Sequence, residues 1–187
     1  MSLDHLWAGW RAPFVDGTTG SGGRDQGSAP GRDQGSAPAT ACVFCRILNS
    51  GLPDAESHVL WRHPGGRVIA LLNAYPYTSG HLMVMPVRHV ADLEALEAGE
   101  LDEIMEGVSA AARALKAAYR PDGLNLGANL GEAAGAGVPG HLHLHVLPRW
   151  SGDTNFMTAV ADTRVLPEAL SASAARVRGA WAGLAST

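Results

Sequence analysis

The sequence has few cysteines, few aromatic residues and no surplus of positive charge. Its 187 residues include only two cysteines, which cannot form a disulfide framework. Lys and Arg total 14 against 18 Asp and Glu, so the net charge is −4, and nucleic acid or an anionic membrane surface is not an expected partner. No apolar run has the roughly 18 residues of a transmembrane helix, and the first residues lack the basic start and apolar stretch of a signal peptide. We expect a cytoplasmic protein with one main domain.

Large apolar side chains are nearly missing from residues 16–40, where the octapeptide GRDQGSAP occurs twice in tandem. Two copies of eight residues are too short for a solenoid, and this composition does not offset the entropy cost of ordering. The segment is therefore predicted to be a flexible linker. It follows residues 1–15, an aromatic segment with Trp7 and Trp10 that is either a free tail or an arm that docks on a folded surface. The folded domain is expected at 41–187.

Within that domain, short β-rich runs surround one long segment with helical spacing. From Gly99 to Tyr119 apolar residues recur at steps of three and four, which predicts a helix that Pro121 stops. A closing helix is predicted at about 165–184. The β-rich runs are HVLWRH, GRVIALLN, HLMVMPVRHV, GLNLGANLG and HLHLHVLPRW. Because helices do not regularly separate these runs, the pattern predicts an α+β fold with a mostly antiparallel sheet.

Three histidines alternate with apolar residues in the last run, as His141-Leu-His143-Leu-His145. Side chains on a strand alternate between its faces, so the histidines are predicted to share one face and the leucines the core face. Solvent, a metal or an anionic substrate are the neighbours that suit the histidine face. The glycine-rich stretch at 131–140 leads into this strand, and glycines let backbone amides approach a phosphate. Histidine at neutral pH serves as nucleophile, proton carrier or ligand, whereas the simplest alternative is an exposed strand face.

The two cysteines form a CxxC motif, Cys42-Val-Phe-Cys45. Such a pair is typical of a redox centre or of half a metal site, and no thioredoxin-like βαβ pattern surrounds it. Zinc takes four ligands in a tetrahedron and accepts sulfur and imidazole, and His89 and His141 are available. The alternative is a pair of free buried thiols.

The run HLHLHVL resembles the motif His-x-His-x-His-x-x, with apolar x, that defines the histidine-triad (HIT) family of nucleotide hydrolases and transferases. The resemblance covers about 41–155. It is strongest to the bacterial diadenosine-polyphosphate phosphorylase-like branch, through LNAYPYTSGHLMV, the glycine bend, HLHLHVLPRWSGDTNF and the upstream LWAGWRAPFV. It implies a HIT-like fold with a five-stranded sheet, a long helix and a homodimeric assembly.

The resemblance also implies roles for individual residues. His143, the middle histidine, is the expected nucleophile that forms a nucleotidyl-histidine, and His145 is expected to stabilise the phosphate. Asn129 matches the asparagine that holds the phosphate, and Asn73 matches the ribose-binding position. His81 is expected to have a supporting or purely structural role.

One stretch departs from the family pattern. Many relatives place Ser, Thr or Gln just before the triad to assist the leaving group, and residues 135–140 here contain none. The backbone amides of Ala136 and Gly137 are the expected substitutes. If these amides do not serve, assistance to the leaving group is weaker, and substrates with good leaving groups, such as polyphosphate chains, are favoured over phosphoramidates.

For the metal, the resemblance implies a closed structural zinc site made of Cys42, Cys45, His89 and His141. The expected reaction is cleavage of a nucleoside phosphoanhydride, with water as acceptor in a hydrolase and inorganic phosphate in a phosphorylase, which the branch favours. The alternatives are a nucleoside phosphoramidase, a nucleotide- or partner-binding protein without catalysis, and a zinc-dependent hydrolase. His58 is predicted to lie at the surface near a turn.

Overall fold

The computed structural model describes residues 38–154 and 168–184. The predicted arm at 1–15 and nearly all of the predicted linker at 16–40 lie outside these residues. The same holds for the start of the closing helix predicted from about 165. None of the helices in the described ranges has the length and hydropathy of a membrane span.

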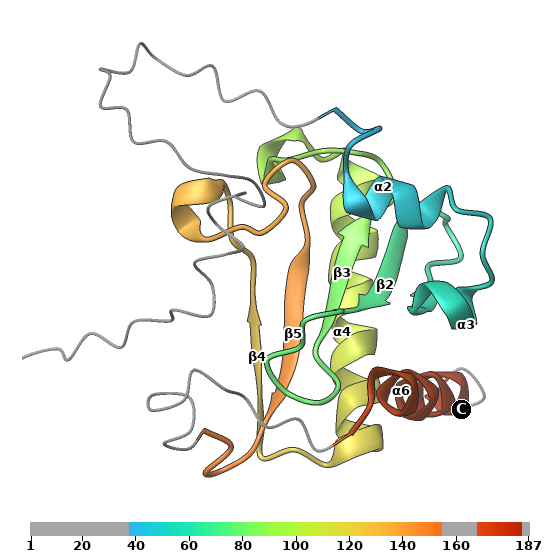
Figure 1. Cartoon of the computed structure of the whole chain (residues 1–187), viewed down its shortest axis with the longest axis vertical. Helices are drawn as coiled ribbons and strands as arrows, with labels where there is room; N and C mark the ends of the chain where they lie inside the picture. Colours follow the sequence, from blue (N-terminus) through green and yellow to red (C-terminus); the bar gives the residue numbers. More distant parts are fainter. Residues whose placement is uncertain (1–37, 155–167, 185–187) are drawn as a thin grey trace, which may run out of the picture.

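A five-stranded sheet lies at the centre of the fold, and every neighbouring pair of its strands is antiparallel (Figure 1). The spatial order is β1-β2-β3-β5-β4. The prediction of an α+β fold with a five-stranded antiparallel sheet is thereby confirmed. The strands are β1 (Val59–Arg62), β2 (Val68–Leu72), β3 (Leu82–Pro86), β4 (Gly123–Gly127) and β5 (Leu144–Arg149).

The long helix α4 spans Ala98–Tyr119, close to its predicted bounds. It begins with a capping box, in which the Glu97 backbone N–H donates to the Glu100 carboxylate at 2.9 Å. It ends where Arg120 adopts a left-handed conformation, with φ 46°. The remaining elements are helices α2 (Val43–Leu48), α3 (Asp54–Ser57) and α6 (Leu170–Leu184) and the 3₁₀ turns η2 (Leu93–Ala95) and η3 (Glu132–Ala134).

The two faces of the sheet pack against different elements. Helices α4 and α6 lie on one face, which we call the α4 face, and the short helix α2 lies on the other, the α2 face. Successive residues of β2 contribute to both faces. Val68, Ala70 and Leu72 face α4, whereas Ile69 and Leu71 face α2.

Gly107 lets α4 approach the sheet closely. A Cβ at this position would lie 3.0 Å from Val84 Cγ1 and 3.2 Å from the Trp61 ring. The α4 face is therefore closely packed.

The histidine row begins before β5. The strand begins at Leu144, so His141 and His143 precede it. The predicted alternation nevertheless holds, because Leu142 and Val146 belong to the core of the α4 face. The three histidines are thereby directed toward the α2 face.

Candidate active site and metal centre

Two of the three histidines are almost fully buried beneath α2. His141 is 0 % exposed and His143 5 % exposed. The Phe44 ring of α2 meets both edge-on, with centroid separations of 5.5 Å to His141 and 5.2 Å to His143. Bulk solvent is therefore not the neighbour of this part of the row, so the exposed-face alternative does not describe it.

His143 is held in one tautomer by a backbone carbonyl two residues earlier in the chain. Its Nδ1 lies 2.8 Å from the carbonyl oxygen of His141. Because a carbonyl only accepts, Nδ1 carries the proton and Nε2 keeps a free lone pair. Burial lowers the pKa of His143, against a smaller opposing effect of this hydrogen bond, so the ring stays neutral. A neutral imidazole with a free Nε2 is the form in which histidine acts as a nucleophile.

His145 is fixed by a chain of hydrogen bonds from a neighbouring loop. The backbone N–H of Tyr77 donates to His81 Nδ1 at 3.1 Å, so the neutral His81 ring carries its proton on Nε2. That Nε2 lies 2.9 Å from His145 Nδ1 and donates to it. His145 consequently carries its proton on Nε2, which makes this nitrogen a donor.

A cavity of about 520 Å³ opens beside these two rings. His143, His145, Asn73, Asn129 and Gly137 all line it, so the structure brings these predicted site residues together. Its remaining lining is mostly apolar, as in typical small-molecule sites.

Three predicted substrate contacts take part in local hydrogen bonds. Asn129 Nδ2 donates to the Gly135 carbonyl at 3.3 Å and so supports the glycine bend. Asn73 Oδ1 accepts from the Tyr75 backbone N–H at 2.9 Å. The Ala136 amide donates to the Gly131 carbonyl at 3.3 Å, which leaves the neighbouring Gly137 as the better placed amide donor.

Four candidate metal ligands lie close together at the N-terminal end of α2. The ligand atoms of Cys42, Cys45, His89 and His141 all lie within 4.8 Å of one another. Sγ of Cys45 is 3.4 Å from His89 Nδ1 and 3.6 Å from His141 Nδ1. Ligands bound to one ion at about 2.0–2.3 Å are spaced in this way around a tetrahedron. Two thiols and two imidazoles therefore fit a metal ion in both number and geometry.

The protonation states in this cluster agree with that fit. His141 Nε2 donates to the Pro86 carbonyl at 2.9 Å, which leaves Nδ1 unprotonated beside the cysteines. Burial is the main reason that the pKa of His141 is lowered, so the ring stays neutral. Burial and the adjacent Cys42 raise the pKa of Cys45 to about 11, so without a cation the Cys45 thiol remains protonated.

The comparison with protein families decides the classification. The model of the HIT domain matches residues 54–152, which is more than half of the chain. The chain belongs to the HIT family. The resemblance of its histidine run to that family is thereby confirmed.

Two curated relatives illustrate its place in the family. The AP-4-A phosphorylase of Mycobacterium tuberculosis strain H37Rv is 44 % identical over 131 residues, which are 70 % of this chain and 66 % of the relative. The chain thus spans slightly less than two thirds of that protein's length. An uncharacterized HIT-like protein of Methanocaldococcus jannaschii is 33 % identical over 60 % of this chain and 81 % of its own length.

Solved HIT structures share the fold. A zinc-bound histidine triad family protein from Mycobacterium smegmatis superposes with a TM-score of 0.63 at 29 % identity, covering 79 % of this chain and 98 % of that one. A histidine triad nucleotide-binding protein from Sulfolobus tokodaii gives a TM-score of 0.62 at 28 % identity, covering 76 % and 93 %.

Sequence reasoning missed two features of the site. The bond between His81 and His145 joins residues 64 positions apart, and no pattern within either segment signals it. His58 was expected at the surface, but it lines the cavity. The available signal was its position directly before β1. This strand pairs with β2, and Leu71 of β2 also lines the cavity.

Proposed function

We propose that this HIT protein cleaves a nucleoside phosphoanhydride of the diadenosine polyphosphate type through a nucleotidyl intermediate on His143. The observation that carries the proposal is the bond between His143 Nδ1 and the His141 carbonyl, which leaves an unprotonated Nε2 at a cavity wall. Nε2 attacks the α-phosphorus, an N–P bond forms, and the P–O bond to the leaving nucleotide breaks with its electron pair on that oxygen. Splitting the displacement into two steps makes each one easier.

The neighbouring groups stabilise charge on the phosphoryl group. The bond from His81 to His145 Nδ1 leaves the proton of His145 on Nε2. His145 is thereby proposed to supply a hydrogen-bond donor at the same wall of the cavity. The Gly137 amide is the proposed second donor, on a bend that Asn129 supports. Asn73 is proposed to contact the ribose. Residues 135–140 contain no Ser, Thr or Gln side chain to donate a hydrogen bond to the leaving group, which suits a polyphosphate leaving group better than an amine.

We assign the cluster of Cys42, Cys45, His89 and His141 to a structural zinc ion. Two sulfur and two nitrogen ligands fill a tetrahedral shell, so no position stays open for substrate. Such an ion would hold α2 against the triad and supply stability rather than chemistry. The zinc-bound relative from Mycobacterium smegmatis supports the choice of metal.

Inorganic phosphate is the proposed acceptor in the second step. Its attack on the nucleotidyl-histidine releases a nucleoside diphosphate and frees His143. The support comes from the AP-4-A phosphorylase, which is 44 % identical to this chain. Two cysteine thiols as ligands suit a reducing compartment, in keeping with the cytoplasmic location expected from the sequence.

A homodimer is the proposed assembly. Strand β4 forms one edge of the sheet and leaves Leu126 57 % exposed. An open strand edge with an exposed apolar side chain is suited to pairing with a second copy. Sedimentation equilibrium tests this: a twofold mass supports the dimer, and a monomer at micromolar concentration contradicts it.

Product analysis tests the proposed reaction. We would incubate the protein with diadenosine tetraphosphate, with and without inorganic phosphate, beside His143→Ala and His143→Asn. Asparagine keeps an amide donor for the His141 carbonyl but has no second nitrogen to attack with, so both variants should be inactive. ADP and ATP formed only with phosphate support the phosphorylase, whereas AMP and ATP without phosphate identify a hydrolase. Turnover by either variant, or none by the wild type, contradicts the proposal.

A further inference from the structure

The cavity extends across the sheet from the histidine row to the start of the edge strand β1. His143 and His145 belong to the β5 segment, whereas His58, which also lines the cavity, directly precedes β1. In the sheet order, β3 and β2 lie between them. Three steps of the interstrand spacing are roughly 14 Å. One nucleotide, with its phosphate at the triad and its base pointing away from it, bridges such a distance.

The middle of the cavity suits a flat apolar ring. Its walls are formed by Val43, Phe44, Ile47, Leu71, Met83 and Val138. Apolar walls bind a heterocycle without distinguishing one base from another, because every base presents an apolar face. Discrimination between bases therefore requires a polar group at the far end.

His58 is such a group. Its Nδ1 is buried without a hydrogen-bond partner, and among the described residues no bond to its ring is found. Buried polar atoms in folded proteins are normally paired, so an unpaired one at a cavity wall is notable. Because Nδ1 is enclosed, Nε2 is the ring nitrogen that a ligand in the cavity can reach.

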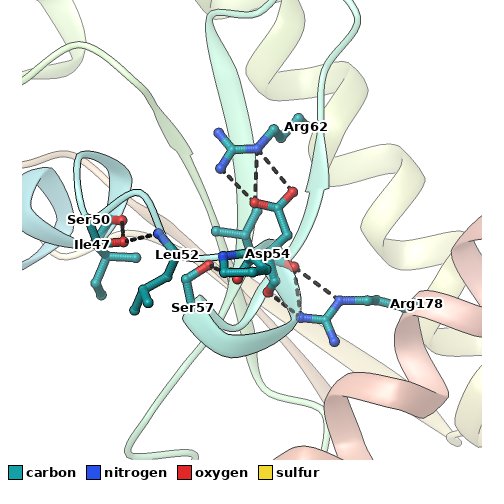
Figure 2. A network of polar contacts seen from close by, with 9 residues as sticks. Ile47, Ser50, Leu52, Asp54, Ser57, Arg62 and Arg178 are labelled. Carbon is teal, nitrogen blue, oxygen red and sulfur yellow. Dashed lines mark hydrogen bonds and ion pairs between the residues drawn. The ribbon is translucent and has the colours of Figure 1, made fainter.

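The backbone around His58 is firmly held, in contrast to its ring. The His58 carbonyl accepts from the Leu72 N–H at 3.0 Å. Arg178 of α6 donates through Nη2 to the Asp54 carbonyl at 2.6 Å and to the Val59 carbonyl at 2.9 Å, thereby fixing the chain on both sides of His58 (Figure 2). His58 itself is left-handed, with φ 59°. The backbone position from which the His58 side chain extends is thus fixed in advance of ligand binding, which lowers the ordering cost of a specificity group.

Burial of Nδ1 also decides which tautomer His58 adopts. A proton on Nδ1 would be a buried donor without an acceptor, and orphaned N–H groups are rarer than orphaned acceptors. The proton is therefore expected on Nε2. His58 then offers one hydrogen-bond donor to an acceptor on the ligand.

We propose that His58 selects purine nucleotides, because its Nε2–H donates to an acceptor nitrogen on the outer edge of a purine base that a smaller pyrimidine does not reach. This inference rests on the proposed function for the orientation of the nucleotide. It adds the selection of the base, which the triad does not supply.

The test compares binding of AMP and UMP by isothermal titration calorimetry to the wild-type protein, His58→Phe and His58→Asn. Phenylalanine keeps the ring volume and removes the donor. Asparagine tolerates positive φ and retains a donor that is too short to reach, so a shared effect of both variants does not come from a strained backbone. The wild type is expected to prefer AMP. Both variants should lose about tenfold in AMP affinity, the usual size for an unpaired polar group, with UMP affinity unchanged. Thermal unfolding and metal content verify folding.

Equal binding of AMP and UMP by the wild type, no binding of AMP, or an unchanged preference in both variants overturns the inference. The result is separable from the proposed reaction. If diadenosine tetraphosphate is not cleaved but the AMP preference exists and depends on His58, the proposed function fails while the selection by His58 stands.

Discussion

The two faces of the sheet are built in different ways. The α4 face is covered by a 22-residue and a 15-residue helix, and a large cluster of buried apolar side chains packs between these helices and the sheet. The α2 face is covered by a six-residue helix without a side-chain N-cap bond, and it carries the cysteines, the histidine row and the cavity. A helix of six residues is not stable on its own. The α4 face therefore has the larger apolar core, whereas the α2 face holds its functional groups with local hydrogen bonds and, in our proposal, a bound ion.

Loss of the metal from the α2 face should give the largest effect on stability. Cys45→Ser, or removal of the ion with a chelator, deprives α2 of its attachment to His89 and His141. We expect the free energy of unfolding to fall by about 5 kcal/mol, below the values for peptides that fold only with zinc. Thermal unfolding followed by zinc titration measures it. Readdition of zinc should restore the chelated wild type but not the variant, and an unfolding midpoint independent of zinc would refute the assignment.

A substitution that creates a cavity in the core of the α4 face should lower stability without changing turnover. Leu115 is fully buried in its core, and Leu115→Ala should cost about 3 kcal/mol of stability. Turnover per folded molecule should stay unchanged, because the site lies on the other face. Leu101→Ala is the matched control, since Leu101 is 44 % exposed on the same helix and should cost less than about 0.5 kcal/mol. Urea unfolding and steady-state kinetics check both, and a large drop in turnover for Leu115→Ala would mean that the faces are coupled.

Replacement of His81 tests the orientation of His145. His81→Phe keeps an aromatic ring but removes the donor that fixes the His145 tautomer. We expect kcat to fall about tenfold, or 1.4 kcal/mol, with KM nearly unchanged, since the bond positions a group that we propose to act in the transition state. His63→Phe, outside the cavity lining, is the histidine control and should leave kcat unaltered. A change in KM alone would assign His81 to substrate binding instead.

The smallest expected effect concerns the attachment of the cavity wall to α6. Arg178→Ala frees the carbonyls on both sides of His58 and should raise KM about threefold at constant kcat, because it disturbs binding remote from phosphorus. Arg62→Ala is its control: Arg62 contacts Asp54 only through an exposed side-chain pair at 2.7 Å (Figure 2). Equal KM values for the two variants would show that Arg178 does not position the wall.

Local patterns in the sequence predicted much of the fold. Helix α4 follows from apolar spacing, and the alternation of leucine and histidine correctly separates the core residues from the site. These features depend on periodicity within one element. The chemistry of the CxxC pair made His89 and His141 available as candidate ligands, but the choice of this set depended on the family resemblance, because Cys42 and His141 are 99 residues apart.

The remaining parts of the site depend on tertiary contacts. The bond from His81 to His145 and the unpaired ring of His58 arise from which loops the strand order brings together. The tautomer of His143 depends on the contact of its side chain with the His141 carbonyl. None of these leaves a periodic signal in the chain.

Trapping the covalent intermediate tests the central claim most directly. The protein would be mixed with diadenosine tetraphosphate without inorganic phosphate, quenched at alkaline pH and digested for peptide mass spectrometry, beside His143→Asn. The account predicts an adenylyl group on the peptide that contains His143, its absence from the variant, and its disappearance when phosphate is added before the quench. Turnover without any adduct on His143, or an adduct on another residue that survives in the variant, would contradict it.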